Sequence, residues 1–111
     1  MPLALYNSLV WVEQTSMKLA IIIVNWNTRE LLSQCLRSVD ETVREGSSLA
    51  VETFVVDNAS VDGSAQMLPG QFPWVQLIAN TENVGFARAN NQAIAKSRGR
   101  YVVLLNSDTE V

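Results

Sequence analysis

The side chains best suited to binding or catalysis lie in four short polar clusters, and each cluster directly follows an apolar run. The four clusters are Asn25-Trp26-Asn27, Asp57-Asn58, residues 80–83 and Asn106-Ser107-Asp108. In open α/β sheets, ligands bind in the crevice outside the carboxyl ends of the strands. If the apolar runs are parallel strands, the four clusters meet at one rim of the sheet. Polar residues also begin ordinary turns, but that explanation accounts for one cluster better than for four.

Asn106 and Asp108 could hold a divalent cation. They offer an amide oxygen and a carboxylate two residues apart, and residues at this spacing in an extended segment face the same side. Oxygen ligands of this kind suit a Mg²⁺ or Mn²⁺ ion that keeps waters and shares a diphosphate. One carboxylate binds such an ion weakly, so the phosphates of a substrate would have to complete the site. An Asx-type turn is the structural alternative for this pair.

The other clusters could bind a nucleotide. Trp26 could stack on a nucleobase, although a core tryptophan is the simpler explanation for this residue alone. Asp57 and Asn58 could bond a base edge or a ribose hydroxyl, and the charged Asp57 would make the stronger bond. Arg88 lies near the start of an expected helix, where it would strengthen the field that favours a diphosphate. The candidate nucleotide-binding residues are Asn25, Trp26, Asn27, Asp57, Asn58 and Arg88.

The elements that must position these side chains follow from the apolar pattern. Uninterrupted runs rich in β-branched residues are typical of strands buried on both faces, and they predict strands over residues 18–24, 51–56, 74–79 and 101–105. Helices are expected between the strands. Such alternation predicts an α/β fold with a mainly parallel sheet and helices on both faces.

Local signals predict where the helices begin, end and face the core. Asn27 and Glu30 are spaced as a capping box, Pro69-Gly70 is expected to stop the second helix, and Gly99 to cap a third helix over residues 86–97. The apolar stripe of the first helix comprises Leu31, Leu32, Cys35, Leu36 and Val39.

Composition and charge argue against several classes. The 111 residues, 48% of them hydrophobic, fit one globular domain. A net charge of −3 gives no electrostatic case for nucleic acid or an anionic membrane as the main partner. Without histidine, no histidine-dependent triad or histidine zinc site can form within the chain, and the single Cys35 is expected to be a core thiol. Neither a dinucleotide-binding glycine motif after the first strand nor a P-loop is present.

Four segments together resemble a known family. They are residues 22–27 (Ile-Ile-Val-Asn-Trp-Asn), 56–64 (Val-Asp-Asn-Ala-Ser-Val-Asp-Gly-Ser), 83–91 (Asn-Val-Gly-Phe-Ala-Arg-Ala-Asn-Asn) and 105–108 (Leu-Asn-Ser-Asp). They resemble the successive motifs of family 2 glycosyltransferases, in particular the bacterial rhamnosyltransferase-like branch. The resemblance covers residues 18–111. It implies a GT-A fold with a Rossmann-like nucleotide-binding half, and inverting transfer of a rhamnose-like sugar in polysaccharide or cell wall biosynthesis.

The resemblance also implies roles for individual residues. Trp26 matches the aromatic residue beside the base, and Asp57-Asn58 matches the paired motif that contacts base and ribose, with an amide as its second member. Arg88 matches an arginine near the nucleotide. Asn106-Ser107-Asp108 matches the DXD motif with its first acid replaced, which leaves Asp108 as the main ligand of a Mg²⁺ or Mn²⁺ ion.

The same resemblance divides the chain and suggests its partners. Residues 1–17 are expected to be an extension, either disordered or a start-site artefact. Residues 18–111 are expected to be an N-terminal fragment that binds a dTDP-, UDP- or GDP-sugar, with the general base and the site for a saccharide or lipid-linked acceptor beyond Val111. We therefore expect binding without transfer by the 111 residues alone.

Two expectations concern location and the rival function. No apolar run approaches the roughly 20 residues that cross a bilayer, so no transmembrane segment is expected in this chain. The expected location is the cytoplasm, peripheral at the inner face of the membrane through the part beyond Val111. The sequence leaves open the alternative of a non-catalytic nucleotide-binding module.

Overall fold

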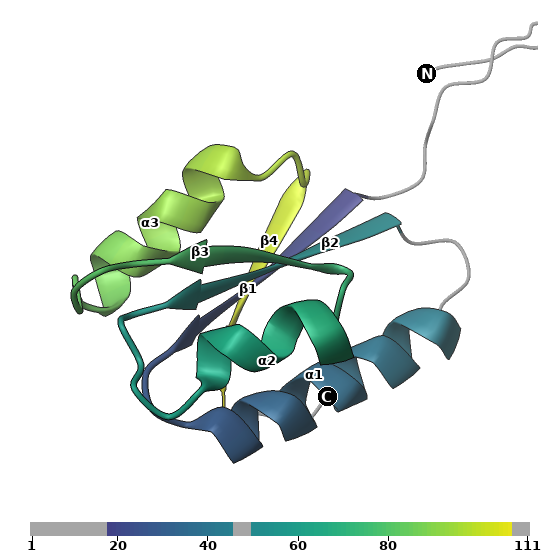
Figure 1. Cartoon of the computed structure of the whole chain (residues 1–111). Coiled ribbons are helices and arrows are strands. Elements are labelled where there is room, and N and C mark those ends of the chain that lie inside the picture. Colours follow the sequence, from purple (N-terminus) through teal and green to yellow (C-terminus); the bar gives the residue numbers. More distant parts are fainter. Residues whose placement is uncertain (1–17, 46–49, 108–111) are drawn as a thin grey trace, which may run out of the picture.

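The computed structural model describes residues 18–45 and 50–107 (Figure 1). Strands and helices alternate in the order β1 (Lys18–Asn25), α1 (Arg29–Glu45), β2 (Ala50–Asp57), α2 (Ser64–Gln71), β3 (Val75–Ala79), α3 (Phe86–Lys96) and β4 (Tyr101–Asn106). Each expected strand is present, with ends shifted by one residue at most. The expectations for residues 1–17 and for Asp108 lie outside the described residues.

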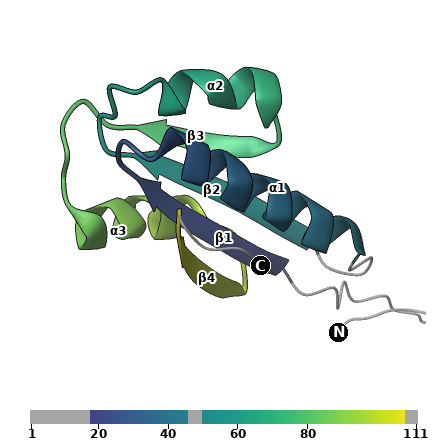
Figure 2. The same ribbon diagram turned by 90° about the horizontal axis from the view of Figure 1, so that it is seen from below.

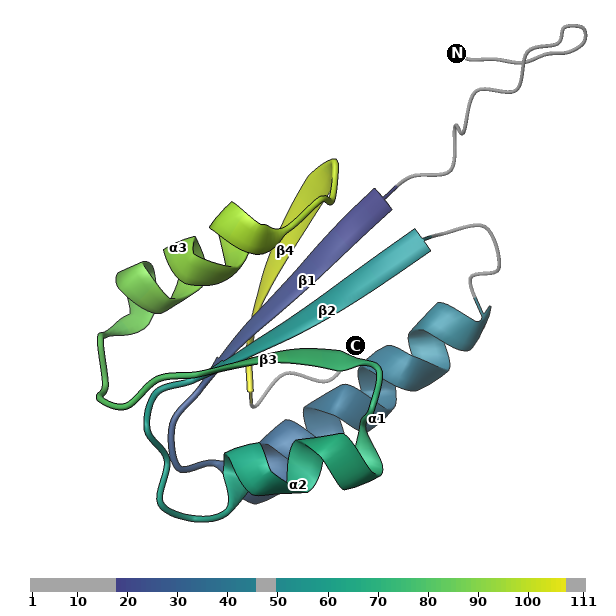
Figure 3. The ribbon, with the colours of Figure 1, turned by 45° about the horizontal axis from the view of Figure 1, so that its top comes forward.

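The four strands form one parallel sheet in the order β3-β2-β1-β4. β1 is therefore interior, as its continuous apolar run predicts. The strand ends are in register, because Asn25 pairs with Asp57 and Val24 pairs with Asn106. The chain adds β2 and β3 on one side of β1 and β4 on the other (Figure 3). This change of direction between β1 and β4 marks the place where open α/β sheets bind ligands.

Helices cover both faces of the sheet, with α1 and α2 on one side and α3 on the other (Figure 2). Successive residues of β1 point to opposite faces, so Ile21 and Ile23 pack under α1 and α2 while Ile22 packs under α3. This two-sided burial is why β1 needs an unbroken apolar sequence. In the described part of the chain, no helix has the length and apolar character to cross a membrane.

α1 contacts the sheet through the expected stripe, with one exception. Leu32, Cys35, Leu36 and Val39 are buried, and the fully buried Cys35 confirms the core-thiol interpretation. The expectation for Leu31 is wrong, because 40% of this residue is exposed. Residues three and four apart share a helix face. Cys35, Leu36 and Val39 follow Leu32 at this spacing, and Leu31 lies outside the face that they share.

The expected end of α2 at Pro69-Gly70 is wrong. Pro69 lies inside α2, which runs on to Gln71. Proline within a helix removes one backbone hydrogen bond. The last helical turn of α2 is kept because Met67 and Leu68 are buried against the sheet. This packing outweighs the preference of Pro69 and Gly70 for a helix end.

The sequence suggested that Gly99 caps α3, and this expectation is wrong. The helix ends at Lys96, and Ser97 is its C-cap with φ −75°. Gly99 lies beside β1 instead, where an added Cβ would come within 2.6 Å of the amide nitrogen of Ala20. The glycine is therefore required by a close approach of two backbones.

β4 forms one edge of the sheet. Four of its apolar side chains are between 38% and 53% exposed: Tyr101, Val102, Val103 and Leu104. An open edge with apolar side chains is a template for pairing with another chain. The described part of the chain is therefore expected to aggregate when isolated.

Candidate nucleotide-binding site

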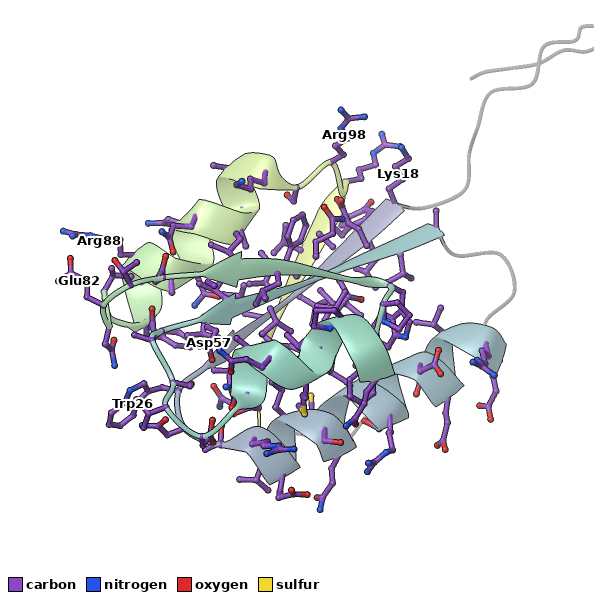
Figure 4. All side chains as sticks on the ribbon, viewed as in Figure 1. Lys18, Trp26, Asp57, Glu82, Arg88 and Arg98 are labelled. Carbon is purple, nitrogen blue, oxygen red and sulfur yellow. The ribbon has the colours of Figure 1, made fainter. Side chains whose placement is uncertain are left out.

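A buried polar cluster lies where β1 and β2 end, and Asp57 is at its centre (Figure 4). Asn25 is fully buried and Asp57 is 2% exposed. Asn25 Nδ2 donates to Asp57 Oδ1 at 3.0 Å. Ser60 donates twice to the same carboxylate, from its backbone nitrogen to Oδ2 at 3.0 Å and from Oγ to Oδ1 at 2.6 Å. Because each carboxylate oxygen can accept two bonds, Oδ2 retains one acceptor position.

Thr28 connects this cluster to the end of β4. Its Oγ1 donates to Asn25 Oδ1 at 2.6 Å and lies 2.8 Å from Ser107 Oγ. A hydroxyl has one proton, so Ser107 is the donor in the second contact. Hydrogen bonds therefore link the ends of β1, β2 and β4 into one rim.

Asn27 fixes the turn that follows β1. Its backbone nitrogen donates to Ser60 Oγ at 2.8 Å, and its Oδ1 accepts from the backbone nitrogen of Val61 at 2.8 Å. With φ 54°, Asn27 is in the left-handed region, which asparagine tolerates better than most residues. The expected capping role of Asn27 toward Glu30 is thus replaced by a contact with the loop after β2.

Asn58 organises the loop between β3 and α3. Its Oδ1 accepts from Asn80 Nδ2 at 3.0 Å and from Val84 N at 3.4 Å, and its Nδ2 donates to Gly85 O at 3.3 Å. Asn80 and Gln92 exchange two side-chain bonds of 2.9 and 3.0 Å. The Asn58 amide is therefore engaged within the protein and holds residues 80–85 against α3.

Besides Asn27, whose amide oxygen accepts a bond from Val61, three candidate residues are exposed at this end of the sheet. Trp26 is 55% exposed, and Arg88 is also exposed. Both lie toward the same side of the molecule as Glu82, whereas Lys18 and Arg98 lie at the opposite end (Figure 4). Asn106 is exposed as the last residue of β4. These side chains are accessible to a ligand without a change of the buried cluster.

The described residues contribute few ligands to a metal site. Within residues 18–45 and 50–107, no three His, Cys, Asp or Glu residues gather closely enough to hold an ion. Asn106 offers an exposed amide oxygen at the rim. Asp108 lies outside the described residues, so the cation site of Asn106 and Asp108 stays a prediction.

Thr28 and Ser60 received no role from the sequence. Ser60 stands three residues after Asp57, a spacing at which an Asp side chain often accepts bonds from the following turn, so this contact had a local signal. Thr28 meets Ser107 across a separation of 79 residues. No pattern within one segment indicates such a contact.

Asp62 caps α1 from the loop after β2. Its Oδ2 accepts from the backbone nitrogen of Arg29 at 2.9 Å, and its Oδ1 accepts from both the backbone nitrogen and the hydroxyl of Ser64. Burial alone would raise the pKa of Asp62, but the bonds from Ser64 and Arg29 outweigh it and hold the pKa below the ordinary 3.8. A carboxylate at a helix N-terminus is also favoured by the helix dipole.

Asp62→Asn is expected to lower the free energy of unfolding by about 1 kcal/mol at neutral pH, because the amide NH2 group replaces an oxygen that accepts a bond from Arg29 or Ser64. Because the pKa is lowered in the folded state, the carboxylate stabilises the fold above pH 3.8, and this contribution disappears as the pH falls through the folded-state pKa. Urea unfolding at several pH values measures the difference between variant and parent, which should vanish in acid. Glu41→Gln, an exposed change on α1, is the matched control and should show no such trend.

Comparison with known proteins gives a consistent result. Residues 20–111 match the profile of glycosyl transferase family 2. The poly(ribitol-phosphate) beta-glucosyltransferase of Bacillus spizizenii is 33% identical over 97 residues, which cover 83% of this chain and 15% of that protein. A putative teichuronic acid biosynthesis glycosyltransferase of Bacillus subtilis is 30% identical over 93 residues, covering 80% of this chain and 35% of that protein.

A solved structure agrees with these matches. The mannosyltransferase PcManGT from Pyrobaculum calidifontis, in complex with GDP-Man and Mn²⁺, has a TM-score of 0.74 and 27% identity, covering 87% of this chain and 29% of that one. The chain thus spans well under two thirds of the length of these relatives. The Rossmann-like GT-A fold expected from the motifs is confirmed. Because the match covers the helices, the rim and all but the first two residues of the sheet, the chain belongs to glycosyl transferase family 2.

Proposed function

We propose that residues 18–111 bind a nucleoside-diphospho-sugar at the carboxyl rim, as the donor-binding part of an inverting glycosyltransferase. The observation that carries this proposal is the buried Asn25–Asp57–Ser60 cluster beside the change of strand direction. Polar groups that are already ordered lose less entropy when a ligand binds. The exposed Trp26 next to the cluster is available to the ligand.

Each rim residue has a proposed role toward the donor. Trp26 stacks on the base, and Asp57 accepts a bond from base or ribose at the remaining position of Oδ2. Asn58 acts by holding residues 80–85 in place, because its amide is engaged there. Arg88 neutralises the diphosphate from the first turns of α3. Asn25 and Asn27 contribute by fixing the two ends of the turn after β1.

The proposed reaction joins an acceptor hydroxyl oxygen to the anomeric carbon of the sugar. The bond from that carbon to the diphosphate oxygen breaks with inversion, and the hydroxyl proton passes to a general base outside the described residues. A divalent cation held by Asp108 and Asn106, when bound, stabilises the charge on the leaving diphosphate. The bound Mn²⁺ of the mannosyltransferase relative supports a cation in this role.

The relatives support a role in polysaccharide or cell wall synthesis. Two of them are named for poly(ribitol-phosphate) and teichuronic acid, and the mannosyltransferase is bound to GDP-Man. For this chain we propose a dTDP-, UDP- or GDP-sugar as donor, with rhamnose as the first sugar to test, and a saccharide or lipid-linked acceptor. We also propose that the protein acts in the cytoplasm at the inner face of the membrane.

Asp108→Ala is expected to remove the contribution of Mg²⁺ or Mn²⁺ to nucleotide binding, because Asp108 is the only carboxylate proposed for the ion. Titration calorimetry with UDP, dTDP and GDP, each with and without metal, measures this contribution. Glu110→Ala changes a neighbouring acid and should keep the metal effect. A metal effect that survives in Asp108→Ala would show that the ligand assignment is wrong.

The 111-residue chain is expected to bind donor without releasing nucleoside diphosphate to an acceptor. At the rim, Asp57 and Asp62 already accept bonds from the protein. The remaining acceptor position of Asp57 is assigned to the donor, so we propose neither residue as the base that takes the hydroxyl proton. A release assay over a panel of dTDP-, UDP- and GDP-sugars tests this, and acceptor-dependent release would place the base inside the chain. Affinity that depends on the attached sugar favours a transferase, whereas equal affinity for every nucleotide favours a non-catalytic module.

A further inference from the structure

Half of the cationic side chains of this acidic protein gather at the end of the molecule opposite the rim. The chain has eight Lys and Arg residues. Four of them form what we call the basic end: Lys18, Lys96, Arg98 and Arg100. The backbone nitrogen of Arg100 donates to Lys18 O at 2.8 Å, so the start of β1 and the segment before β4 are neighbours. Figure 4 shows Lys18 and Arg98 projecting from this end.

The side chains of the basic end are available to a partner. All four residues are exposed, and within residues 18–45 and 50–107 no ion pair engages them. Glu52 is the acid that approaches them, and it accepts a bond from the backbone nitrogen of Arg98 rather than from its guanidinium. Among the described residues, the four cations therefore outnumber the neighbouring carboxylate of Glu52.

Exposed apolar side chains flank the cations. Ile94 is 41% exposed, Tyr101 is 53% exposed and Val102 is 40% exposed. Tyrosine and aliphatic side chains beside lysine and arginine suit the boundary between lipid headgroups and acyl chains. A nucleic acid would make no use of exposed aliphatic groups in pairing with phosphates.

The net charge of the chain does not oppose an anionic surface at this end. Between exposed charges, screening limits interactions to about 8–10 Å at physiological salt. β1 has eight residues, so its two ends lie about 23 Å apart at the usual rise per residue. The acids of the rim are thus screened from a surface that touches the basic end. A flat anionic surface at the basic end stays away from the acids of the rim, whereas an anionic partner that wraps around the molecule would come close to these acids.

We propose that the basic end binds the surface of a bilayer containing anionic phospholipid. The guanidinium and ammonium groups pair with lipid phosphates, and the exposed Ile94 and Tyr101 enter the headgroup layer. In this orientation the rim with Trp26 faces water, from which a soluble donor arrives. This attachment lies within the chain itself and does not depend on the identity of the donor.

Vesicle flotation in a density gradient with the 111-residue chain tests the proposal, because bound protein rises with the vesicles whereas aggregated protein sinks. The chain should bind vesicles of phosphatidylcholine with phosphatidylglycerol, and not phosphatidylcholine alone. Because one basic residue near an anionic leaflet strengthens binding about fivefold, Arg98→Gln with Arg100→Gln should weaken it about thirtyfold. Arg29→Gln with Arg37→Gln removes the same charge from exposed positions of α1 away from the basic end and should leave binding within about twofold. Added salt should release the parent protein.

Folding of the variants is checked by circular dichroism. Glutamine keeps the backbone bonds of residues 98 and 100, so both double variants should melt as the parent does. Lys96→Gln, at the exposed end of α3, is a second variant and should weaken binding about fivefold. Equal binding to neutral vesicles, equal losses in the two double variants, or preference for duplex DNA over vesicles at the same salt would each overturn the proposal.

Discussion

Asp57→Ala is expected both to remove the hydrogen bonds that hold the rim together and to weaken nucleotide binding. The carboxylate accepts three bonds from Asn25 and Ser60, and its removal leaves buried donors without an acceptor. We expect the free energy of unfolding to fall by about 3 kcal/mol. Loss of the proposed bond to base or ribose should weaken nucleotide binding by about 2 kcal/mol, or about thirtyfold. Urea unfolding and titration calorimetry measure the two effects separately.

Ser60→Ala separates the structural role of this cluster from its role in binding. It removes the hydroxyl bonds to Asp57 and Asn27 but keeps the carboxylate and the backbone bond of Ser60. We expect a loss of about 1–2 kcal/mol in stability with nucleotide affinity changed only a few-fold. If Asp57→Ala binds nucleotide as the parent does while remaining folded, the proposed contact of Asp57 with the donor is wrong.

Gly99→Ala is expected to destabilise the fold by about 1–3 kcal/mol or more, as when extra atoms are forced into a packed interior. The added Cβ would lie 2.6 Å from Ala20 N, 2.8 Å from Ala20 Cβ and 3.0 Å from Tyr101 O. Two of these atoms are backbone atoms, held by the pairing of β1 with β4. The clash can therefore be relieved only by moving the strands apart, and thermal melting should report it.

Gly70→Ala is the matched control for Gly99. Gly70 lies within α2, and nothing lies within 4 Å of the position of an added Cβ. Alanine is preferred over glycine in helices by about 1 kcal/mol, so this change should leave the melting temperature unchanged or raise it. If both substitutions destabilise equally, steric contact with Ala20 does not explain the requirement at Gly99.

The sequence by itself determined the strands, their direction and the location of the site. Strands buried on both faces need unbroken apolar runs, and the run before Asn25 could form no other buried element of that length. Alternation with helices then requires parallel strands, whose carboxyl ends share one edge. Asn25, Asp57 and Asn106 were therefore predictable as neighbours before any contact was known, and the register confirms it.

Local preference gave the wrong ends for two helices. The Pro69-Gly70 pair and Gly99 both carry strong signals for a helix end. At Pro69 the packing of α2 on the sheet prevails, and at Gly99 the glycine serves the approach to Ala20. Both outcomes depend on atoms that are distant in sequence, so no window around either residue contains the information.

Only the tertiary structure decided which hydrogen bonds each polar residue of the rim makes. Asp57 and Asn58 are adjacent and similar, yet one anchors the end of β1 through Asn25 and the other holds residues 80–85. Trp26, a plausible core residue by type, is exposed. The net charge of the chain likewise gave no sign of the basic end, because a sum of charges does not say where the charged residues lie in the fold. Helix and strand periods arise from contacts a few residues apart, whereas hydrogen-bond partners and surface charge depend on which distant segments the fold brings together.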